Sequence, residues 1–455
     1  PNGRPRPSHA PVIEALCSMS PSLLRDREAL LEREKVAAGV VFRPAGQKET
    51  ASFPVDMVPR ILTGEEWSRL QGGTAQRARA LDAFLADVYG EGRVLRDGVV
   101  PAWLVTESPG HRSAGTAPPP QARRIHVAGF DIVRDGDGRW LVLEDNVRVP
   151  SGIAYAIQNR RLTQRVFPEL VPHGDLWDPE EAPKLLRHTL EESAPPRASG
   201  DTPTIVLLGS GPDDSAYFEH RMLADAMGVP AVVSTDLLVE DNVVWHVGGK
   251  ERRRVDVIYL RMDDQLAKRP SANRLPLGPK LVDAVRAGTV TLANALGNGV
   301  ADDKAVYDYV PKLIEYYLGE HPLLEQVKTY HCADPDQKAE VLSRLAELVV
   351  KPIDGYGGLG VVIGPRATEL ELDEARLLID EQPSRWIAQE LVSLSTHPTL
   401  EGGKLRPRHV DLRIFVYYGQ EPVAVPAALT RVAPSGSMVV NSSRGGGAKD
   451  TWLLR

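Results

Sequence analysis

Two apolar runs on either side of a turn-forming string carry three oxygen-bearing side chains. The runs are IHVAGFDIV and WLVLED, and the string RDGDG between them is typical of a β-hairpin turn. Residues two apart on a strand point to the same face, so Glu144 and Asn146 should project together while Asp145 points away. With the turn between the runs, Asp131 on the partner strand is expected close to opposite Glu144.

These three side chains form a ligand set that suits a hard cation. Mg²⁺ takes a few protein oxygens and fills its other positions with water and nucleotide phosphates. Asp131, Glu144 and Asn146 are therefore predicted metal ligands. Taken alone the pattern is weak, because a solvated acidic hairpin is the better interpretation of an isolated E-x-N motif.

A lysine followed by a glycine-rich loop stands in the string ELVVKPIDGYGGLGVVIGP. The run LVV predicts a strand that ends at Lys351, and VVIG predicts a second strand after the loop. Gly355, Gly357 and Gly358 would let backbone N–H groups approach phosphates closely. The glycines could instead serve only a tight turn, but their number beside a strand-end lysine favours phosphate contact. Neither a P-loop nor an early G-x-G-x-x-G of a dinucleotide fold is present.

A second lysine stands at a predicted helix start, in ADDKAVYDYVPKLIEYYLGEHPLL. Apolar residues recur at helical spacing from 306 to 317, and Asp302 or Asp303 could cap the first turn. A cation at a helix start is unfavourable by the helix dipole alone. We therefore expect an anionic group beside Lys304.

The segment SRWIAQELV predicts a short strand that ends in Gln389 and Glu390. Backbone and side-chain groups at this end could read the edge of an adenine. Considered alone, the strand would be assigned to the core.

Together these four pieces resemble the ATP-grasp superfamily, and their order resembles its circularly permuted branch. They are most similar to the permuted proteins assigned as carboxylate–amine ligases and related to glutathionylspermidine synthase. The matching strings are FRP, LEDNVRVPSG, AYFEHRMLADAMGV, VDVIYLRMDD, NALGNGVADDKAVYDYVP, YYLGE, KPIDGYGGLGVVIG, AQELVSLS, DLRIFV and NSSRGGGAKDTW. They extend over nearly the whole chain, from about residue 41 to residue 455.

The resemblance implies a role for each motif. In the glutathionylspermidine synthase relatives an aspartate followed by E-x-N holds Mg²⁺, which implies this role for Asp131, Glu144 and Asn146. Two lysines contact the nucleotide in these relatives, and they resemble Lys304 and Lys351. The loop here lacks the arginine of the relatives' G-R-E-G, which bears on the acceptor substrate more than on ATP. The metal residues precede the lysines, as a permuted connection requires.

The implied reaction is the ATP-dependent ligation of a carboxylate to an amine through an acyl phosphate. Guanidinium groups suit the carboxylate and phosphoryl oxygens of such a reaction, because their planar fork binds two oxygens at once. Arg148, two residues after Asn146, and Arg413 are the favoured catalytic residues. For Arg261 and Arg431 an ordinary ion pair is an equally good interpretation.

The C-terminal segment offers further cationic candidates. Arg444 is another candidate clamp, and Lys449 with the glycines at 445–447 could form a second anion-binding loop. A glycine-rich linker would have the same sequence.

Two other functions remain open. A phosphotransferase with the same site would form ADP without an amine acceptor. An inactive nucleotide-binding or scaffold protein would lack turnover, although the carboxylates and lysines argue against it. Neither zinc-ligand spacing nor a G-x-S-x-G nucleophile motif is present, so metallohydrolase and covalent hydrolase chemistry have little support. The expected substrates are an amino acid or peptide acid and an amine, because the relatives act on peptides and polyamines.

Length and composition agree with an intracellular enzyme of several lobes. The chain has 455 residues, 42% of them hydrophobic, and its two cysteines indicate a reducing cytosol rather than a disulfide framework. The sequence shows neither a membrane-spanning run nor a secretory signal at its start. The net charge of −7 gives no reason to expect nucleic acid. A cytoplasmic location is therefore expected, with neither membrane nor nucleic acid as a partner.

The order of the expected helices and strands indicates an α/β protein built of α+β lobes. The fold that the resemblance implies is a circularly permuted ATP-grasp fold with a doubly wound α/β lobe. The lobe is indicated by the order TIVLLG, AYFEHRMLADAMG and PAVVST, which reads as strand, helix and strand. Thr63 and Glu66 form a capping box that predicts a helix start. The expected divisions are a loose N-terminus to about residue 20 and then a helix (1–40), the N-terminal part of the core with the metal hairpin (41–200), the α/β lobe (201–300), the nucleotide-binding lobe with the glycine-rich loop (301–395) and the C-terminal part of the core (396–455).

Overall fold

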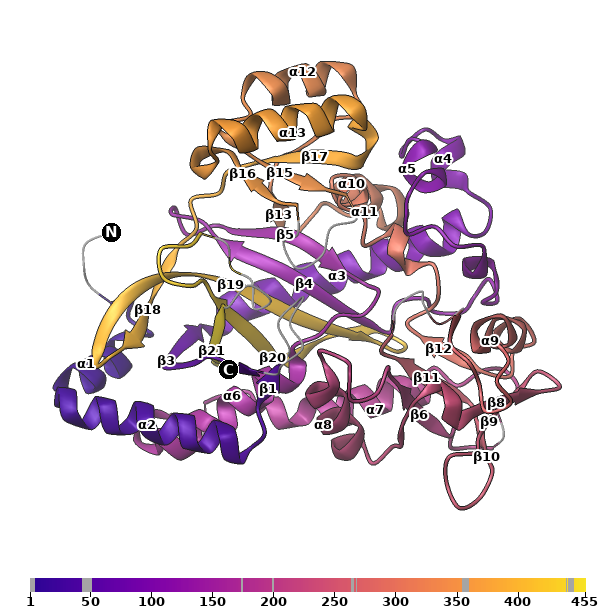
Figure 1. The fold of residues 1–455 in the computed structure, drawn as a ribbon, viewed down its shortest axis with the longest axis horizontal. Coiled ribbons are helices and arrows are strands. Elements are labelled where there is room, and N and C mark those ends of the chain that lie inside the picture. The colour runs from indigo at the N-terminus through magenta and orange to yellow at the C-terminus, as the bar shows by residue number, and fades with distance from the viewer. Residues whose placement is uncertain are drawn as a thin grey trace.

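A computed structural model describes residues 5–42, 51–172, 175–198, 200–262, 266, 268–353, 360–438, 440 and 446–455. A mixed eight-stranded sheet lies at its centre (Figure 1). Its strands in order are β13 (Glu325–Gln326), β5 (Trp140–Asn146), β4 (Val127–Arg134), β19 (Lys404–Tyr418), β20 (Pro422–Val432), β21 (Gly447–Leu453) and β3 (Val55–Leu62), with β18 (Thr396–Glu401) paired to β19. Because β4 pairs with β19, the two ends of the sequence build one sheet.

Helices cover both faces of the central sheet. On one face lie α3 (Gly64–Val88) and α11 (Val310–Leu318), and on the other lie α6 (Ile153–Val166) and α7 (Ala182–Glu192). The capping box that starts α3 is confirmed, since the side chains and backbone N–H groups of Thr63 and Glu66 bond reciprocally.

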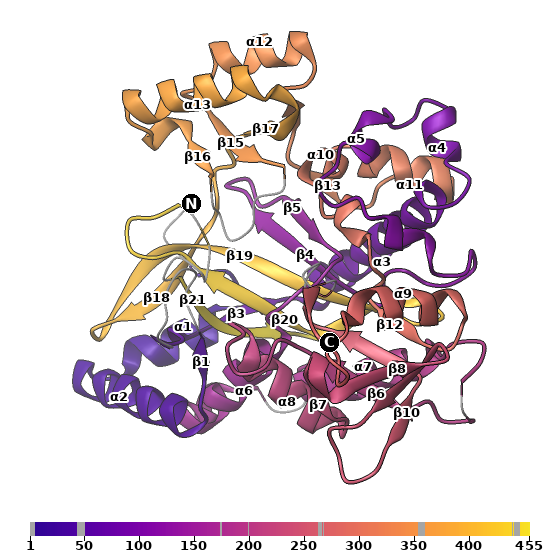
Figure 2. The ribbon, with the colours of Figure 1, turned by 45° about the vertical axis from the view of Figure 1, so that its right-hand side comes forward.

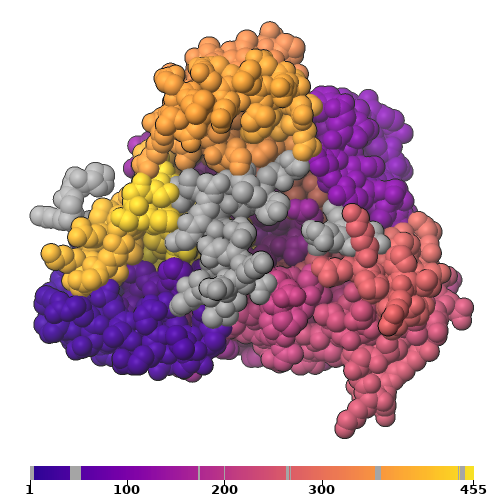
Figure 3. Space-filling model, viewed as in Figure 1, coloured from indigo at the N-terminus to yellow at the C-terminus, as the bar shows by residue number. Residues whose placement is uncertain are grey.

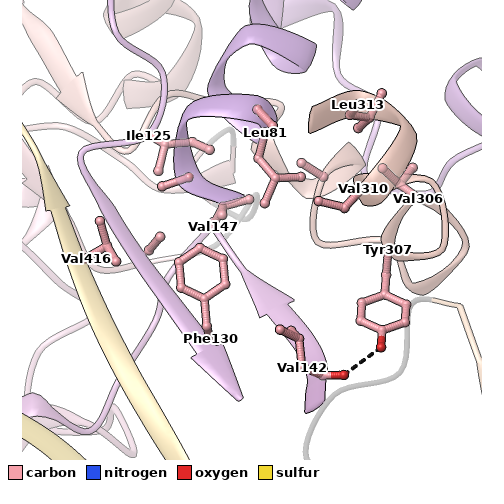
Figure 4. Close-up of a cluster of buried hydrophobic side chains, with 14 of the residues drawn as sticks. Leu81, Ile125, Phe130, Val142, Val147, Val306, Tyr307, Val310, Leu313 and Val416 are labelled. Atoms are coloured by element: carbon pink, nitrogen blue, oxygen red, sulfur yellow. Dashed lines mark hydrogen bonds between the residues drawn. The ribbon is translucent and has the colours of Figure 1, made fainter. Parts of the chain in front are cut away.

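The apolar cluster beneath the hairpin fixes its position on the sheet. Phe130 and Val142 of the hairpin lie in one cluster with Leu81 of α3 and Leu313 of α11 (Figure 4). The hydroxyl of Tyr307 donates to the Val142 carbonyl at 2.7 Å. The hairpin is therefore held from below by both apolar packing and a hydrogen bond.

The N-terminal segment differs from expectation in one respect. The predicted helix is present as α2 (Pro21–Ala37), but the segment expected to be loose also forms a helix, α1 (Ala10–Ser18). Val12 and Leu16 lie one helical turn apart and are buried in the same cluster as Trp452. The expectation was wrong because α1 gains a packing partner from the other end of the chain.

The predicted doubly wound lobe is confirmed by an all-parallel sheet in the order β12-β11-β6-β7. Alternate residues of β6 face opposite sides, so α8 packs on one face and α9 on the other. A small antiparallel sheet of β8, β9 and β10 is attached to the lobe. The bounds are β6 (Ile205–Leu208), α8 (Tyr217–Met227), β7 (Ala231–Val232), β8 (Leu237–Glu240), β9 (Val243–His246), β10 (Arg253–Val255), β11 (Val257–Leu260), α9 (Leu277–Arg286) and β12 (Thr291–Ala293).

A second antiparallel sheet stands apart from the central one, with two helices on its outer side (Figures 1 and 2). Its strands in order are β14 (Thr329–His331), β17 (Trp386–Glu390), β15 (Leu348–Pro352) and β16 (Val362–Ile363), and its helices are α12 (Pro335–Ser343) and α13 (Glu369–Glu381). The antiparallel pairing of β15 with β16 confirms the predicted order of strand, loop and strand.

The helix expected from Lys304 onward is in fact two helices. α10 (Lys304–Tyr307) ends before α11 begins at Val310. The next residue is Pro311, which has no N–H for the helix ladder and restricts the residue before it. The single continuous helix was therefore a wrong prediction, and proline is the reason.

The remaining short elements are β1 (Val41–Phe42), β2 (Ala51–Ser52), α4 (Arg93–Arg96) and α5 (Trp103–Thr106). In the space-filling view the molecule is hollowed between the second sheet with its helices and the α/β lobe (Figure 3). Among the helices in the described ranges, none has the length and apolar character that crossing a membrane requires.

Candidate active site

The hairpin brings Asp131 directly opposite Glu144, as the position of the turn predicts. Leu143 forms a bulge, because the next pair is Ile132 with Val142. Asp145 points to the other face, where its carboxylate accepts two hydrogen bonds of 2.7 Å from Arg77 of α3. Glu144 and Asn146 are thus presented away from the apolar cluster that holds the hairpin.

Four charged side chains from three adjacent strands form a closed network, here called the arginine–aspartate quartet: Asp131, Asp411, Arg413 and Arg431. Arg413 donates to both oxygens of Asp131, at 2.6 Å and 2.8 Å. Arg431 donates to Asp131 at 2.7 Å and, through Nε, to Asp411 at 2.9 Å. The four share a face because Asp131 pairs with Arg413, and Asp411 with Arg431, in the strand register.

Burial and ion pairing shift the pKa of Asp131, a member of the quartet, in opposite directions. Burial alone would raise the pKa of Asp131, but Arg413 and Arg431 hold that pKa well below its usual range. The Asp131 side chain is 3% exposed and the two arginines 14% and 12%. The carboxylate is therefore ionised under all ordinary conditions.

Of the two predicted nucleotide lysines, Lys304 contacts the hairpin. Nζ of Lys304 lies 2.9 Å from a carboxylate oxygen of Glu144, which is the anionic group expected beside it. Burial would raise the pKa of Glu144, but the Lys304 charge lowers it on balance. Asp303 caps α10 by accepting from the N–H of Ala305 at 2.9 Å, as one of the two predicted caps.

Lys351 is the last residue but one of β15 and contacts a neutral group. Its Nζ donates to Oε1 of Gln389 at 2.5 Å. Burial lowers the pKa of Lys351 to about 8, although the Glu144 carboxylate opposes the shift and the Lys304 charge adds to it. These effects put Lys351 within the electrostatic reach of the hairpin.

The side chains of Gln389 and Glu390 point to opposite faces of the sheet, because the two residues are neighbours on one strand. Gln389 is buried between Lys351 and Thr329, to whose hydroxyl it donates at 3.1 Å. Glu390 instead accepts two 3.0 Å bonds from Arg344. Only Gln389 lies with Lys351, so an adenine contact at Glu390 would involve its backbone.

Some of the site residues predicted from the sequence lie outside the part of the chain that the structure describes. Gly355, Gly357 and Gly358 lie outside the described residues, as does Arg444. Their predicted contacts with phosphates stay predictions.

Arg148 lies on the segment that follows β5. Its Nε is 3.3 Å from Oδ2 of Asp302, and its side chain is 39% exposed. Oδ1 of the same aspartate accepts from the N–H of Val147 at 2.5 Å. Burial raises the pKa of Asp302 to about 6, and the Arg148 charge opposes this shift. Arg148 is thus the more exposed of the two favoured arginines.

Arg261 is a fully buried ion pair. It lies 3.0 Å from Glu219 and donates to the carbonyl of Pro150 and the hydroxyl of Ser151, each at 2.6 Å. The ion-pair interpretation of Arg261 is therefore confirmed, and its position fixes the segment after Arg148.

Lys449 does not belong to an anion-binding loop, and that prediction was wrong. It lies within β21 with 0% of its side chain exposed, and it forms an ion pair with Asp56. Its Nζ also donates to the Pro398 carbonyl at 2.8 Å. The glycines before it were misleading, because the strand pairs with β3 and carries Lys449 into the interior.

Two aspartates beside the candidate site were not predicted as site residues from the sequence. Asp411 stands two residues before Arg413, so the period of two on a strand would have placed it on the same face. Asp302 was considered only as a helix cap. Its contact with Arg148 joins segments that are far apart in the sequence, and local spacing carries no signal for it.

The hairpin residues fit a divalent cation. Asp131 accepts three N–H bonds and Glu144 is paired with one ammonium group, whereas a carboxylate offers about four lone-pair positions. Nδ2 of Asn146 is buried and lacks a hydrogen-bond partner among the residues that the structure describes. Turning this amide over would present its oxygen there instead. Groups of three or more His, Cys, Asp or Glu that could hold a metal are absent from the described part of the chain.

Comparison with known proteins identifies related chains. A Frankia alni protein named "Putative glutamate--cysteine ligase 2-3" is 53% identical over 455 residues, which cover 100% of this chain and 53% of that protein. The chain thus spans about half the length of the Frankia relatives it matches. A Mycobacterium tuberculosis protein named as uncharacterised is 47% identical over 450 residues, covering 97% of this chain and 81% of the relative.

A solved structure shares the fold. A glutathione synthetase-like effector from Globodera pallida, in its apo form, superposes with a TM-score of 0.62 over 96% of this chain and 98% of that one, at 12% identity. The sequence model of circularly permuted ATP-grasp type 2 proteins matches residues 59–433. The match agrees with the central sheet built from both ends of the chain and with the separate second sheet. The chain belongs to the circularly permuted ATP-grasp type 2 family.

Proposed function

We propose that the chain is an ATP-dependent ligase that joins a carboxylate to an amine through an acyl phosphate. The observation that carries the proposal is that Nζ of Lys304 lies 2.9 Å from the carboxylate of Glu144, one of the three predicted metal ligands on the hairpin. The quartet lies beside this carboxylate, because Asp131 is its cross-strand partner. Family membership supports ATP as the phosphoryl donor.

The lysines would bind the triphosphate. Lys304 would exchange its Glu144 contact, and Lys351 its amide contact, for phosphate oxygens. Asp131, Glu144 and Asn146 would hold Mg²⁺, which supplies neutralisation of phosphate charge when it is bound.

The first step transfers the γ-phosphoryl group. A carboxylate oxygen of the acid attacks the γ-phosphorus, the bond to the β–γ bridging oxygen breaks, and ADP leaves with that electron pair. Arg148 would bind the acid, since its guanidinium is partly exposed, and Arg413 would face the transferring group from the quartet. The proposed contact of Arg413 would gain strength as charge develops on the transferring group in the transition state.

The second step forms the amide. The amine nitrogen attacks the carbonyl carbon of the acyl phosphate, the carbon–oxygen bond to phosphate breaks, and inorganic phosphate leaves. The proton released from the nitrogen passes to solvent. The tetrahedral intermediate carries an oxyanion, for which Arg148 is the proposed partner.

The names of the Frankia relatives support an amino acid as the carboxylate substrate. Those proteins are about twice as long as the matched region, so their names describe more than this chain. Glutamate is therefore the first acid to test, followed by other amino acids and by peptides. The free thiols of Cys17 and Cys332 support a cytoplasmic location.

Hydroxylamine trapping tests the proposal. Purified protein is incubated with ATP, Mg²⁺, hydroxylamine and each acid in turn, and ADP and hydroxamate are measured. A ligase should form both in equal amounts, because hydroxylamine replaces the natural amine at the activated carbonyl. ADP formed with an alcohol substrate, without hydroxamate or amide, would support the phosphotransferase instead. An inactive nucleotide-binding protein would form neither product.

A further inference from the structure

Three consecutive side chains, Asp302, Asp303 and Lys304, contact three different parts of the molecule. Asp302 contacts Val147 and Arg148, which lie in the segment that follows β5. Asp303 caps α10 and also accepts from the hydroxyl of Ser108 at 2.8 Å. Lys304 reaches Glu144. A short backbone segment therefore joins the nucleotide lysine to Arg148.

The two carboxylate oxygens of Asp302 have separate tasks. Oδ1 accepts from the backbone N–H of Val147 at 2.5 Å, and Oδ2 lies 3.3 Å from Nε of Arg148. The aspartate side chain is only 18% exposed, whereas that of Arg148 is 39% exposed. The long arginine side chain thus contacts a shorter and more buried partner.

We propose that Asp302 is a positioning residue for the ligase reaction, which orients the guanidinium of Arg148 toward the acyl substrate and ties it to the helix that carries Lys304. The inference rests on the proposed function, because it assigns Arg148 an acyl substrate. Asp302 itself touches neither substrate nor nucleotide.

The value of this contact lies in orientation rather than in stability. Ion pairs of partly exposed side chains contribute little to the free energy of folding, because water screens them and ordering the side chains costs entropy. A catalytic side chain that is displaced even a short distance from its proper position, however, can lose much of its effect on the rate. The contact should therefore influence turnover far more than the melting temperature.

Two substitutions separate the tasks of Asp302. Asp302→Asn keeps an oxygen for the N–H of Val147 but removes the charge that faces Arg148. Asp302→Ala removes both contacts. Asp283→Asn is the matched control, because Asp283 is a half-exposed aspartate on α9, paired only with its helix neighbour Arg286 among the contacts of the described chain.

The probe is ADP formation with glutamate and hydroxylamine, or with whichever acid in the amino-acid and peptide panel gives the fastest rate. We expect Asp302→Asn to lower kcat/KM for the acid about tenfold or more, and Asp283→Asn to change it less than about twofold. In an Arg148→Ala background, Asp302→Asn should cost less than about twofold, since its partner is already absent. The melting-temperature shift caused by MgATP should be unchanged.

The pH profile gives a second readout. Arg148, Glu144 and Lys304 are the charged groups whose fields act on Asp302. The pKa of Asp302, which burial raises to about 6, predicts that wild-type kcat/KM for the acid falls as the pH drops through about 6. Protonation removes the charge that orients Arg148, so this acid limb should be absent from Asp302→Asn.

Each outcome decides a separate question. An equal loss from Asp302→Asn in the wild-type and Arg148→Ala backgrounds would mean a merely structural role and overturn the inference. So would full activity of Asp302→Asn, or a loss seen only with Asp302→Ala. If the wild-type protein forms no ADP with any acid in the panel, the proposed function itself fails and the inference falls with it.

Discussion

The quartet and the lysines lie side by side, yet their partners differ in charge. In the quartet each arginine faces at least one carboxylate, and burial is compensated by ion pairs. Lys351 is partly buried and contacts the neutral amide of Gln389, and desolvation by its surroundings lowers its pKa to about 8. A buried ammonium group of this kind gains most from a ligand that brings negative charge. The quartet is thus complete without a ligand, whereas the proposed function expects phosphate to complete the surroundings of Lys351.

The largest effect is expected from substitution of Glu144, which is the cross-strand partner of Asp131 and pairs with Lys304. Glu144→Gln should lower ADP formation by about 10²-fold or more, because a misplaced triphosphate loses the in-line geometry of transfer. Asn146→Ala should act in the same direction. The measurement is steady-state ADP release, with the exposed Glu325→Gln as control. Normal turnover of Glu144→Gln would return the hairpin to a solvated acidic turn.

Removing an arginine from the frame should affect stability. Arg431→Ala leaves Asp131 and Asp411 with one partner fewer in a buried site, which is expected to cost about 3–5 kcal/mol. Arg148→Ala should cost no more than about 1 kcal/mol, since that side chain is 39% exposed. Urea unfolding of both variants measures the difference. Equal losses would show that the quartet is not a preformed frame.

Removing Lys351 should affect ligand binding with the fold retained. MgATP at about 100 times its dissociation constant stabilises a protein by roughly 2.7 kcal/mol, which appears as a rise in Tm. Lys351→Ala should largely abolish this rise, because it deletes a phosphate partner. Lys338→Ala on α12, whose lysine pairs with Asp380, is the control and should keep it. A full rise in Lys351→Ala would contradict the assignment.

The smallest expected effect is on the pH dependence of ATP affinity. The lowered pKa of Lys351, about 8, means that the group is charged below this pH and neutral above it. The affinity for MgATP should therefore weaken above pH 8, by up to about tenfold per pH unit for a single proton. Calorimetric titration between pH 7 and 9.5 measures this slope. Lys351→Arg should bind without it, because arginine stays protonated.

The sequence predicted the local geometry of the site well and its long-range contacts poorly. The opposition of Asp131 and Glu144 follows from the period of a strand and the position of a turn, and both are visible in one short segment. The pairing of Asp131 with Arg413 joins residues that are 282 positions apart, and spacing carries no information about it. The resemblance supplied the candidates, but only the sheet shows which of them meet.

Burial explains the other differences. Residues 1–20 were expected to be loose because they are rich in Pro and Ser, whereas Val12 and Leu16 of α1 are buried in a cluster with Trp452 from the other end of the chain. Lys449 remained a candidate for an anion-binding loop in the sequence, because its burial against Asp56 depends on the pairing of β21 with β3. The roles of the site residues and the lobe boundaries near 200, 300 and 395 stay predictions.

The ion pair between Arg77 and Asp145 has a consequence for how β5 finds its place. If β5 paired with β4 one residue out of step, Asp145 would enter the site, and Glu144 and Asn146 would face Arg77 and the apolar cluster. Such an arrangement would separate Asp145 from Arg77 and leave buried charges without their partners, at a cost of several kcal/mol by the usual scale. The pair of Arg77 and Asp145 thereby favours the one alignment in which Glu144 and Asn146 face the candidate site.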